Sequence, residues 1–130
     1  MIGLEKYELG LKKKSFSLYY HGGEIWCEHL DSFYEEKELL IHKFKEDLVA
    51  IKRPSTSSLI IVNLDESQVD IEILDFIISN LHTMNKSLQK VVFVGLNLKL
   101  RRYIKKSNRE TSFVMTCIND YEKAKEWLFL

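Results

Sequence analysis

The sequence predicts a single α/β domain, in which a mixed and mostly parallel sheet of about five strands packs with about four helices. Two observations support this class. Short β-branched runs, such as residues 59–64 and 91–94, alternate with segments of helical apolar spacing, which favours parallel strands joined by right-handed crossovers. A Gly-Gly pair between two strand-like runs near the N-terminus adds an antiparallel hairpin. We expect the order ββαβαβαβα within residues 16–130, after a polar leader over residues 1–15.

The hairpin and a long amphipathic helix come first. Strands are expected at residues 16–20 and 24–28, on either side of the Gly-Gly turn. Ser32 and Glu35 have the spacing of a capping box, in which each side chain satisfies a backbone N–H of the first helical turn. The helix is therefore expected to begin at Ser32. Pro54 ends it, because proline disfavours a helical residue before it.

The middle of the chain holds the expected core strands. Residues 59–64 form a continuous apolar run, which indicates a central strand covered on both faces. A second helix is expected to begin near Asp70, where a carboxylate favours the positive end of the helix dipole. Residues 91–94 predict another buried strand, which Gly95 closes, and Asn97 is placed to cap a short basic helix.

The chain is expected to finish with one more strand and one more helix. Residues 112–117 form the strand, and Asn119 followed by Glu122 repeats the capping pattern. Ala124, Trp127 and Leu128 would give this helix its inner face. The connections are too short to hold a second domain.

Composition narrows the class of protein. Apolar residues make up 45% of the chain, with only one Pro and five Gly, which excludes a disordered or collagen-like chain. Cys27 and Cys117 lie far apart in strand-like runs, so we expect reduced core thiols. The sequence contains neither an apolar run long enough to span a membrane nor a recognisable secretory signal. We expect a cytoplasmic protein that does not bind a membrane.

Charge is distributed in blocks, although the formal net charge is zero. Residues 54–85 carry only acidic charges, and residues 86–109 carry only basic ones. The acidic residues are Asp65, Glu66, Asp70, Glu72 and Asp75, and the basic ones are Lys86, Lys90, Lys99, Arg101, Arg102, Lys105, Lys106 and Arg109. Opposite patches on neighbouring helices can orient a partner.

No signature of catalysis or cofactor binding is present. The chain lacks the glycine-rich phosphate loops, the nucleophile elbow and the zinc-protease motif, so we expect no cofactor, no metal and no enzyme. Cys27 and His29 fall on one face of a strand and leave a Cys/His enzyme as the weakest alternative. Tyr103 lies on the inner stripe of the basic helix, where it packs and does not stack on bases, so no nucleic-acid partner is expected.

The second half of the chain resembles the STAS domain family, which includes the bacterial anti-sigma-factor antagonists. The resemblance rests on Val91-Val92-Phe93-Val94-Gly95-Leu96-Asn97, Leu100-Arg101-Arg102-Tyr103-Ile104, Phe113 and Glu122-Lys123-Ala124-Lys125-Glu126-Trp127-Leu128. The expected order of elements also matches that fold. The resemblance implies a regulatory module in bacterial signalling that acts by docking a protein.

One motif departs from the family pattern. Where switching antagonists carry Asp-Ser-Ser-Gly at the start of the second helix, this chain has Asp70-Ile71-Glu72-Ile73. The serine that a partner kinase would phosphorylate is missing, so no phosphorylation switch is expected at this position. Glu72 supplies a permanent negative charge in its place.

The leading hypothesis is a non-enzymatic module that docks a regulatory protein, such as an anti-sigma factor or a kinase-like protein, or a second copy of this chain. The expected docking residues are Asp70, Ile71, Glu72, Asp75, Gly95, Asn97, Arg101 and Arg102. The alternative is a domain that binds a nucleotide or a lipid-like ligand. It rests on the aromatic residues near the hairpin, namely Tyr19, Tyr20, Trp26, Phe33 and Tyr34.

Overall fold

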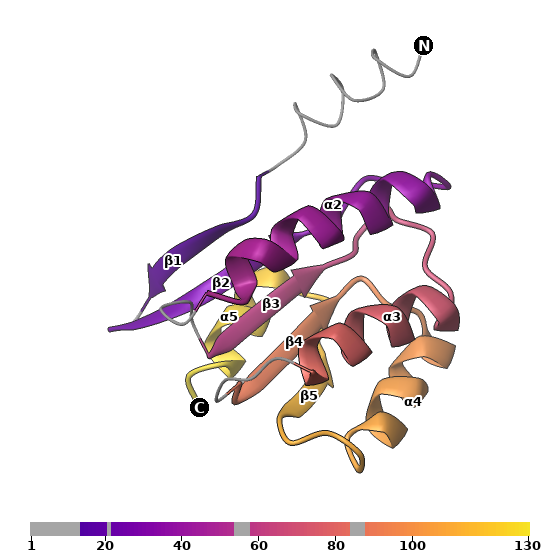
Figure 1. The fold of residues 1–130 in the computed structure, drawn as a ribbon. Helices are drawn as coiled ribbons and strands as arrows, with labels where there is room; N and C mark the ends of the chain where they lie inside the picture. The colour runs from indigo at the N-terminus through magenta and orange to yellow at the C-terminus, as the bar shows by residue number, and fades with distance from the viewer. Residues whose placement is uncertain (1–13, 21, 54–57, 84–87) are drawn as a thin grey trace.

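A computed structural model describes residues 14–20, 22–53, 58–83 and 88–130 (Figure 1). Its elements are β1 (Phe16–Tyr20), β2 (Gly23–His29), α2 (Lys37–Ile51), β3 (Leu59–Asn63), α3 (Ile71–His82), β4 (Lys90–Val94), α4 (Leu98–Ser107), β5 (Val114–Cys117) and α5 (Tyr121–Trp127). The α/β class, with a five-stranded mixed sheet and four helices in the described residues, is confirmed. The expected polar leader lies almost wholly outside the described residues.

The strands follow one another across the sheet in the order of the chain, β1-β2-β3-β4-β5. β1 pairs with β2 in antiparallel fashion, and every later pair is parallel. The expected central strand is confirmed, since β3 is the middle strand and its Ile61 pairs with Cys27 on one side and Val92 on the other.

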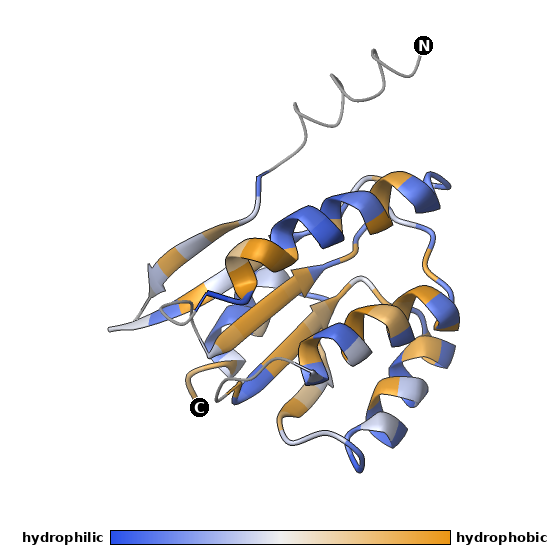
Figure 2. Ribbon diagram, in the orientation of Figure 1, coloured by the Kyte–Doolittle hydropathy of each residue, from blue (hydrophilic) through white to orange (hydrophobic). Residues whose placement is uncertain are grey.

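The two faces of the sheet are covered unequally. α2, α3 and α4 lie on one face, and α5 lies on the other (Figure 1). Alternate residues of β3 serve the two sides: Ile60 and Val62 pack under the three helices, whereas Ile61 packs under α5. β3 and β4 are accordingly almost uniformly hydrophobic, as Figure 2 shows. Such strands must be buried on both faces.

Two of the expected helix starts are confirmed. Asp70 caps α3, with Oδ1 accepting a hydrogen bond from the Ile73 N–H at 2.8 Å. Asn97 caps α4 in the same way through the Leu100 N–H at 2.9 Å. Both caps satisfy backbone donors that have no partner within the helix.

The other two expected helix starts are wrong. α2 begins at Lys37, because Ser32 has a left-handed backbone (φ 62°) and donates its N–H to the carbonyl of Asp65. The segment after β2 thus continues alongside the segment after β3. α5 is capped by Asp120, which accepts from the Lys123 N–H, while the Asn119 side chain bonds elsewhere.

Candidate docking surface

The starts of α3 and α4 meet in a hollow of about 410 Å³. Both helices follow parallel strands, so their N-terminal ends lie at the same edge of the sheet. The residues that line it are Val69, Asp70, Ile71, Glu72, Asn97, Lys99 and Leu100. The structure therefore brings four of the eight expected docking residues together here: Asp70, Ile71, Glu72 and Asn97.

Asp70 is largely occupied by its own neighbours. Besides capping α3, it forms an ion pair with Lys37 of α2. The hydrogen bond from Lys37, and then the one from the Ile73 N–H, lowers the pKa of Asp70. Ile71 is half-buried against the core, so the group in the hollow that is both acidic and unpaired is Glu72. Glu72 is exposed and forms no ion pair within the described residues.

Asp75 lies one turn further along α3 and does not line this hollow. Its Oδ1 accepts a hydrogen bond from the Tyr103 hydroxyl at 2.7 Å. That bond, together with burial, raises the pKa of Tyr103. The pair ties α3 to α4, so Asp75 contributes to the position of the two helices.

Gly95 shapes the turn that leads into α4. Its φ of +93° is a conformation that side chains disfavour, and an added Cβ would lie 2.6 Å from the backbone nitrogen of Asp65. The Gly95 N–H donates to Oδ1 of Asn119 at 3.0 Å, and the Asn119 amide donates to the Leu96 carbonyl. This turn needs glycine, and Asn119, in the segment between β5 and α5, holds it in place through these two hydrogen bonds.

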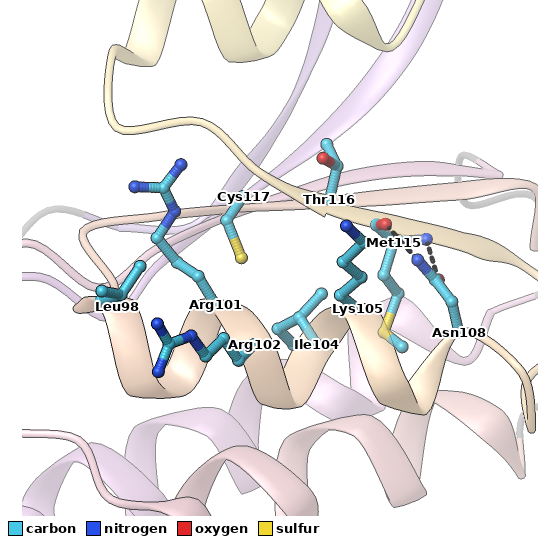
Figure 3. A pocket seen from close by; sticks show the side chains of 9 residues that line it. All are labelled: Leu98, Arg101, Arg102, Ile104, Lys105, Asn108, Met115, Thr116 and Cys117. Carbon is cyan, nitrogen blue, oxygen red and sulfur yellow. Dashed lines mark hydrogen bonds between the residues drawn. The ribbon is translucent and has the colours of Figure 1, made fainter.

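Arg101 and Arg102 lie on the other side of α4. They line a groove of about 570 Å³ between α4 and the edge strand β5 (Figure 3). Six of the eight expected docking residues are thus divided between two hollows that flank one helix, and Asp75 and Gly95 line neither. Sequence reasoning missed this groove because the position of β5 at the sheet edge depends on the strand order. The available signal was the spacing of Leu98, Arg101 and Lys105 on one helix face.

Cys27 and His29 do share one face of β2, but their surroundings do not activate a nucleophile. Cys27 is fully buried, and burial raises the pKa of its thiol. The His29 ring stacks between Phe16 and Tyr121 and bonds to Asp31 at 3.0 Å. A nucleophilic cysteine needs a lowered pKa and access, and Cys27 has neither.

The aromatic residues near the hairpin do not form one surface. Trp26 and Phe33 are buried in the core beneath the helices. Tyr19 and Tyr34 are exposed, and the Tyr20 side chain lies outside the description. The ligand surface expected from these residues is therefore not assembled by the residues described.

A buried charged cluster lies between β2 and α2 and was not anticipated from the sequence. Glu28 is 1% exposed, and its Oε1 accepts from the Trp26 indole N–H at 2.8 Å. Its other oxygen, Oε2, has no hydrogen-bond partner among the described residues. Asp47 accepts from Lys43 at 2.7 Å and from the Ser15 hydroxyl at 2.8 Å. The available signal was an acidic residue that directly follows the apolar run Ile25-Trp26-Cys27 within one strand.

The electrostatics of this cluster favour a neutral Glu28. Burial, and after it the neighbouring Asp47, raises the pKa of Glu28 well above its ordinary value. Burial opposes ionisation of Asp47, but its contacts with Glu28, Lys43 and Ser15 outweigh burial and lower the pKa of Asp47. One proton on Glu28 and one ion pair between Asp47 and Lys43 follow from this arrangement.

Comparison of the chain with protein-family models, curated proteins and solved structures finds no match. Within the described ranges, no helix is both long and apolar enough to cross a bilayer. The same residues contain no group of three or more His, Cys, Asp or Glu side chains placed to hold a metal ion.

Proposed function

We propose that this chain is a non-enzymatic STAS-like regulatory module that docks a protein partner at the hollow between the starts of α3 and α4. The observation that carries the proposal is the unpaired Glu72 at the rim of that hollow, beside the half-buried Ile71. An apolar contact next to a free charge provides both affinity and orientation for a protein surface.

The order of the described elements supports the family resemblance on which this function rests. A hairpin comes first and is followed by strands that alternate with helices, which is the order expected from the resemblance. The Val-Gly-Leu turn and the motif Glu122–Leu128 fall at the end of β4 and on the last helix. By the resemblance, the docking surface proposed here corresponds to the position at which switching antagonists present their serine.

The module would act without a phosphorylation switch at that position. The nearby Ser67 is committed to the fold, because its hydroxyl donates to the Leu30 carbonyl at 2.6 Å and accepts from the Phe33 N–H. Glu72 supplies a carboxylate at this position without the action of a kinase. We infer that the charge of this surface is not changed by phosphorylation, which suits constitutive docking.

The test reverses the charge at Glu72 and measures whether the partner protein is still recovered. Tagged wild type and a Glu72→Lys variant are used to recover proteins from the cytosol of the source cell, and the recovered proteins are quantified by mass spectrometry. Glu126→Lys is the matched control, since Glu126 is exposed on α5 at the opposite face of the sheet. We expect a partner that is lost with Glu72→Lys and kept with Glu126→Lys. Recovery of the same proteins in all three samples would contradict the proposal.

A further inference from the structure

The groove between α4 and β5 carries three cations that have no internal partner. Arg101, Arg102 and Lys105 are exposed along its wall and form no ion pair with any acid in the described part of the chain. Like charges spaced by one helical turn repel each other. Other cations of this protein do pair with acids, for example the exposed Lys37 with Asp70 and the partly buried Lys125 with Glu122. The groove therefore concentrates positive charge that the fold itself does not use.

The floor of the groove is aliphatic. Ile104 and Met115 are almost fully buried, and Cys117 is half-buried between them and the rim. Figure 3 shows Arg101 and Lys105 rising from α4 toward the strand, with the Cys117 sulfur and the Met115 side chain pointing into the space between. Burial raises the pKa of Cys117 to about 11, so its thiol stays neutral at physiological pH. An occupant would meet cations at the rim and apolar atoms beneath.

At one end of the groove, the Asn108 side chain hydrogen-bonds to the backbone of β5 as a neighbouring strand would. The Asn108 amide donates to the Met115 carbonyl and accepts from the Met115 N–H, both at 2.7 Å. The N–H groups of Val114 and Ile118 bond to the β4 side, so those of Met115 and Cys117 point to the outer edge. Asn108 covers the edge at Met115, and the edge at Cys117 faces the groove.

We propose that this groove binds an extended acidic segment of a partner protein, whose alternate carboxylates pair with Arg101 and Lys105 while its backbone lies along the edge of β5 at Cys117. Arg101 and Lys105 are separated by about 6 Å along the helix axis. Alternate side chains of an extended strand are about 6.6–6.8 Å apart on one face. The spacing of the cations thus matches an acid at every second position.

The lining favours a peptide over a nucleic acid. None of the nine residues that line the groove is aromatic, so it offers no platform on which bases could stack. The methylene groups of the acidic side chains would contact Ile104 and Met115, which lie on the same side as the cations, and the planar guanidinium of Arg101 matches a carboxylate. This binding is independent of the hollow between α3 and α4, which none of these residues lines.

The experiment measures fluorescence anisotropy of a labelled synthetic peptide in which Asp and Glu alternate with Leu and Val. The full-length protein is titrated as wild type, as Arg101→Glu with Lys105→Glu, and as a control with Lys106→Glu and Arg109→Glu. The control makes the same charge change at exposed positions near the end of α4 that do not line the groove. Circular dichroism verifies that all three proteins are folded.

We expect saturable binding to the wild type, a loss of affinity of about tenfold or more in the groove variant, and little change in the control. A peptide with Asn and Gln in place of the acids should bind weakly. Equal loss in both variants, equal binding of the neutral peptide, or no binding to the wild type would overturn the proposal. So would tighter binding of single-stranded nucleic acid or anionic vesicles through the same two cations.

Discussion

The two hollows that flank α4 differ in what their charges already do. On the α3 side, Asp70 is bonded to Lys37 and to the start of its own helix, and Asn97 caps α4. On the β5 side, Arg101 and Lys105 form no ion pair with an acidic side chain among the described residues. Of the charged residues that line the first hollow, Asp70 helps to hold the fold together, while Glu72 and Lys99 form no ion pair within the described residues. On the second side none of the charged lining residues is paired within those residues, so all of them remain available for an external anion.

This contrast indicates how a neutral chain can present binding surfaces. A charge that is already paired gains little from a partner, because the new contact replaces an existing one. Surface charges therefore matter for binding where the fold leaves them unpaired. The groups that the fold already uses should therefore affect stability when they are replaced.

The turn at Gly95 supports the start of α4 and hence both hollows. Gly95→Ala should lower the free energy of unfolding by about 2–4 kcal/mol, because the new Cβ would collide with the backbone of Asp65 at a strained φ. Urea unfolding measures the loss. The matched control is Gly22→Ala, where φ is also positive but nothing lies within 4 Å, and the expected cost is about 1 kcal/mol. Equal costs at the two positions would contradict the close approach.

The buried cluster under α2 extends the comparison to charge inside the core. The pKa of Glu28 is raised in the folded state, so its stabilising contribution is present at low pH and is lost as the pH rises above 4.5 toward the folded-state pKa. Glu28→Gln stays neutral throughout and can donate to Asp47. The stability of this variant relative to the wild type should therefore increase with pH above about 5 in urea titrations. A constant difference from pH 5 to pH 8 would show that Glu28 is already ionised.

Asn108 is the polar group of the β5 groove that the fold does use. Asn108→Ala removes both side-chain bonds to Met115 and leaves an open strand edge, so we expect a loss of about 1–3 kcal/mol. An exposed edge also invites pairing between molecules, which sedimentation at increasing concentration would detect. Asn80→Ala is the control, since it removes one bond to the backbone of its own helix. A cost no larger than that of the control would argue against the edge-covering role.

The exposed pair between Lys37 and Asp70 should show the smallest effect. Asp70→Asn keeps an N-cap but loses the ion pair, for an expected cost below about 1 kcal/mol. Because the pKa of Asp70 is lowered on folding, the contribution is present above 3.8 and is lost as the pH falls through the folded-state value. The difference between the two proteins should also shrink at about 1 M salt. A salt-independent cost would point to the cap instead.

The helix starts show what a sequence can and cannot reveal about such sites. Asp70 and Asn97 were identifiable because each precedes an apolar helical pattern and bonds only to its own first turn. Ser32 and Asn119 had equally good patterns, but both are engaged by distant backbone, at Asp65 and at Gly95. Local spacing carries no information on such contacts.

The separation of the expected docking residues into two hollows was not predictable for the same reason, because it also depends on contacts between segments that are distant in the sequence. Arg101 and Asp70 were expected in one docking surface, yet Arg101 lines the groove against β5. Helical periodicity separates Lys99 from Arg101 around the axis, but the neighbour that each one faces depends on the order of the strands. Glu28 was missed because its partners Lys43 and Asp47 come from the following helix.

The sequential order of the strands also bears on how the chain acquires its structure. Every strand pairs only with strands that are adjacent to it along the chain, so each pairing closes either the N-terminal hairpin or one crossover through a single helix. Folding can then proceed from the N-terminus during synthesis, with each strand and helix added to a growing edge. β5 would be the last strand to join and α5 the last helix to cover the sheet. A nascent chain whose β5 is still inside the ribosome would therefore lack the α4–β5 groove altogether.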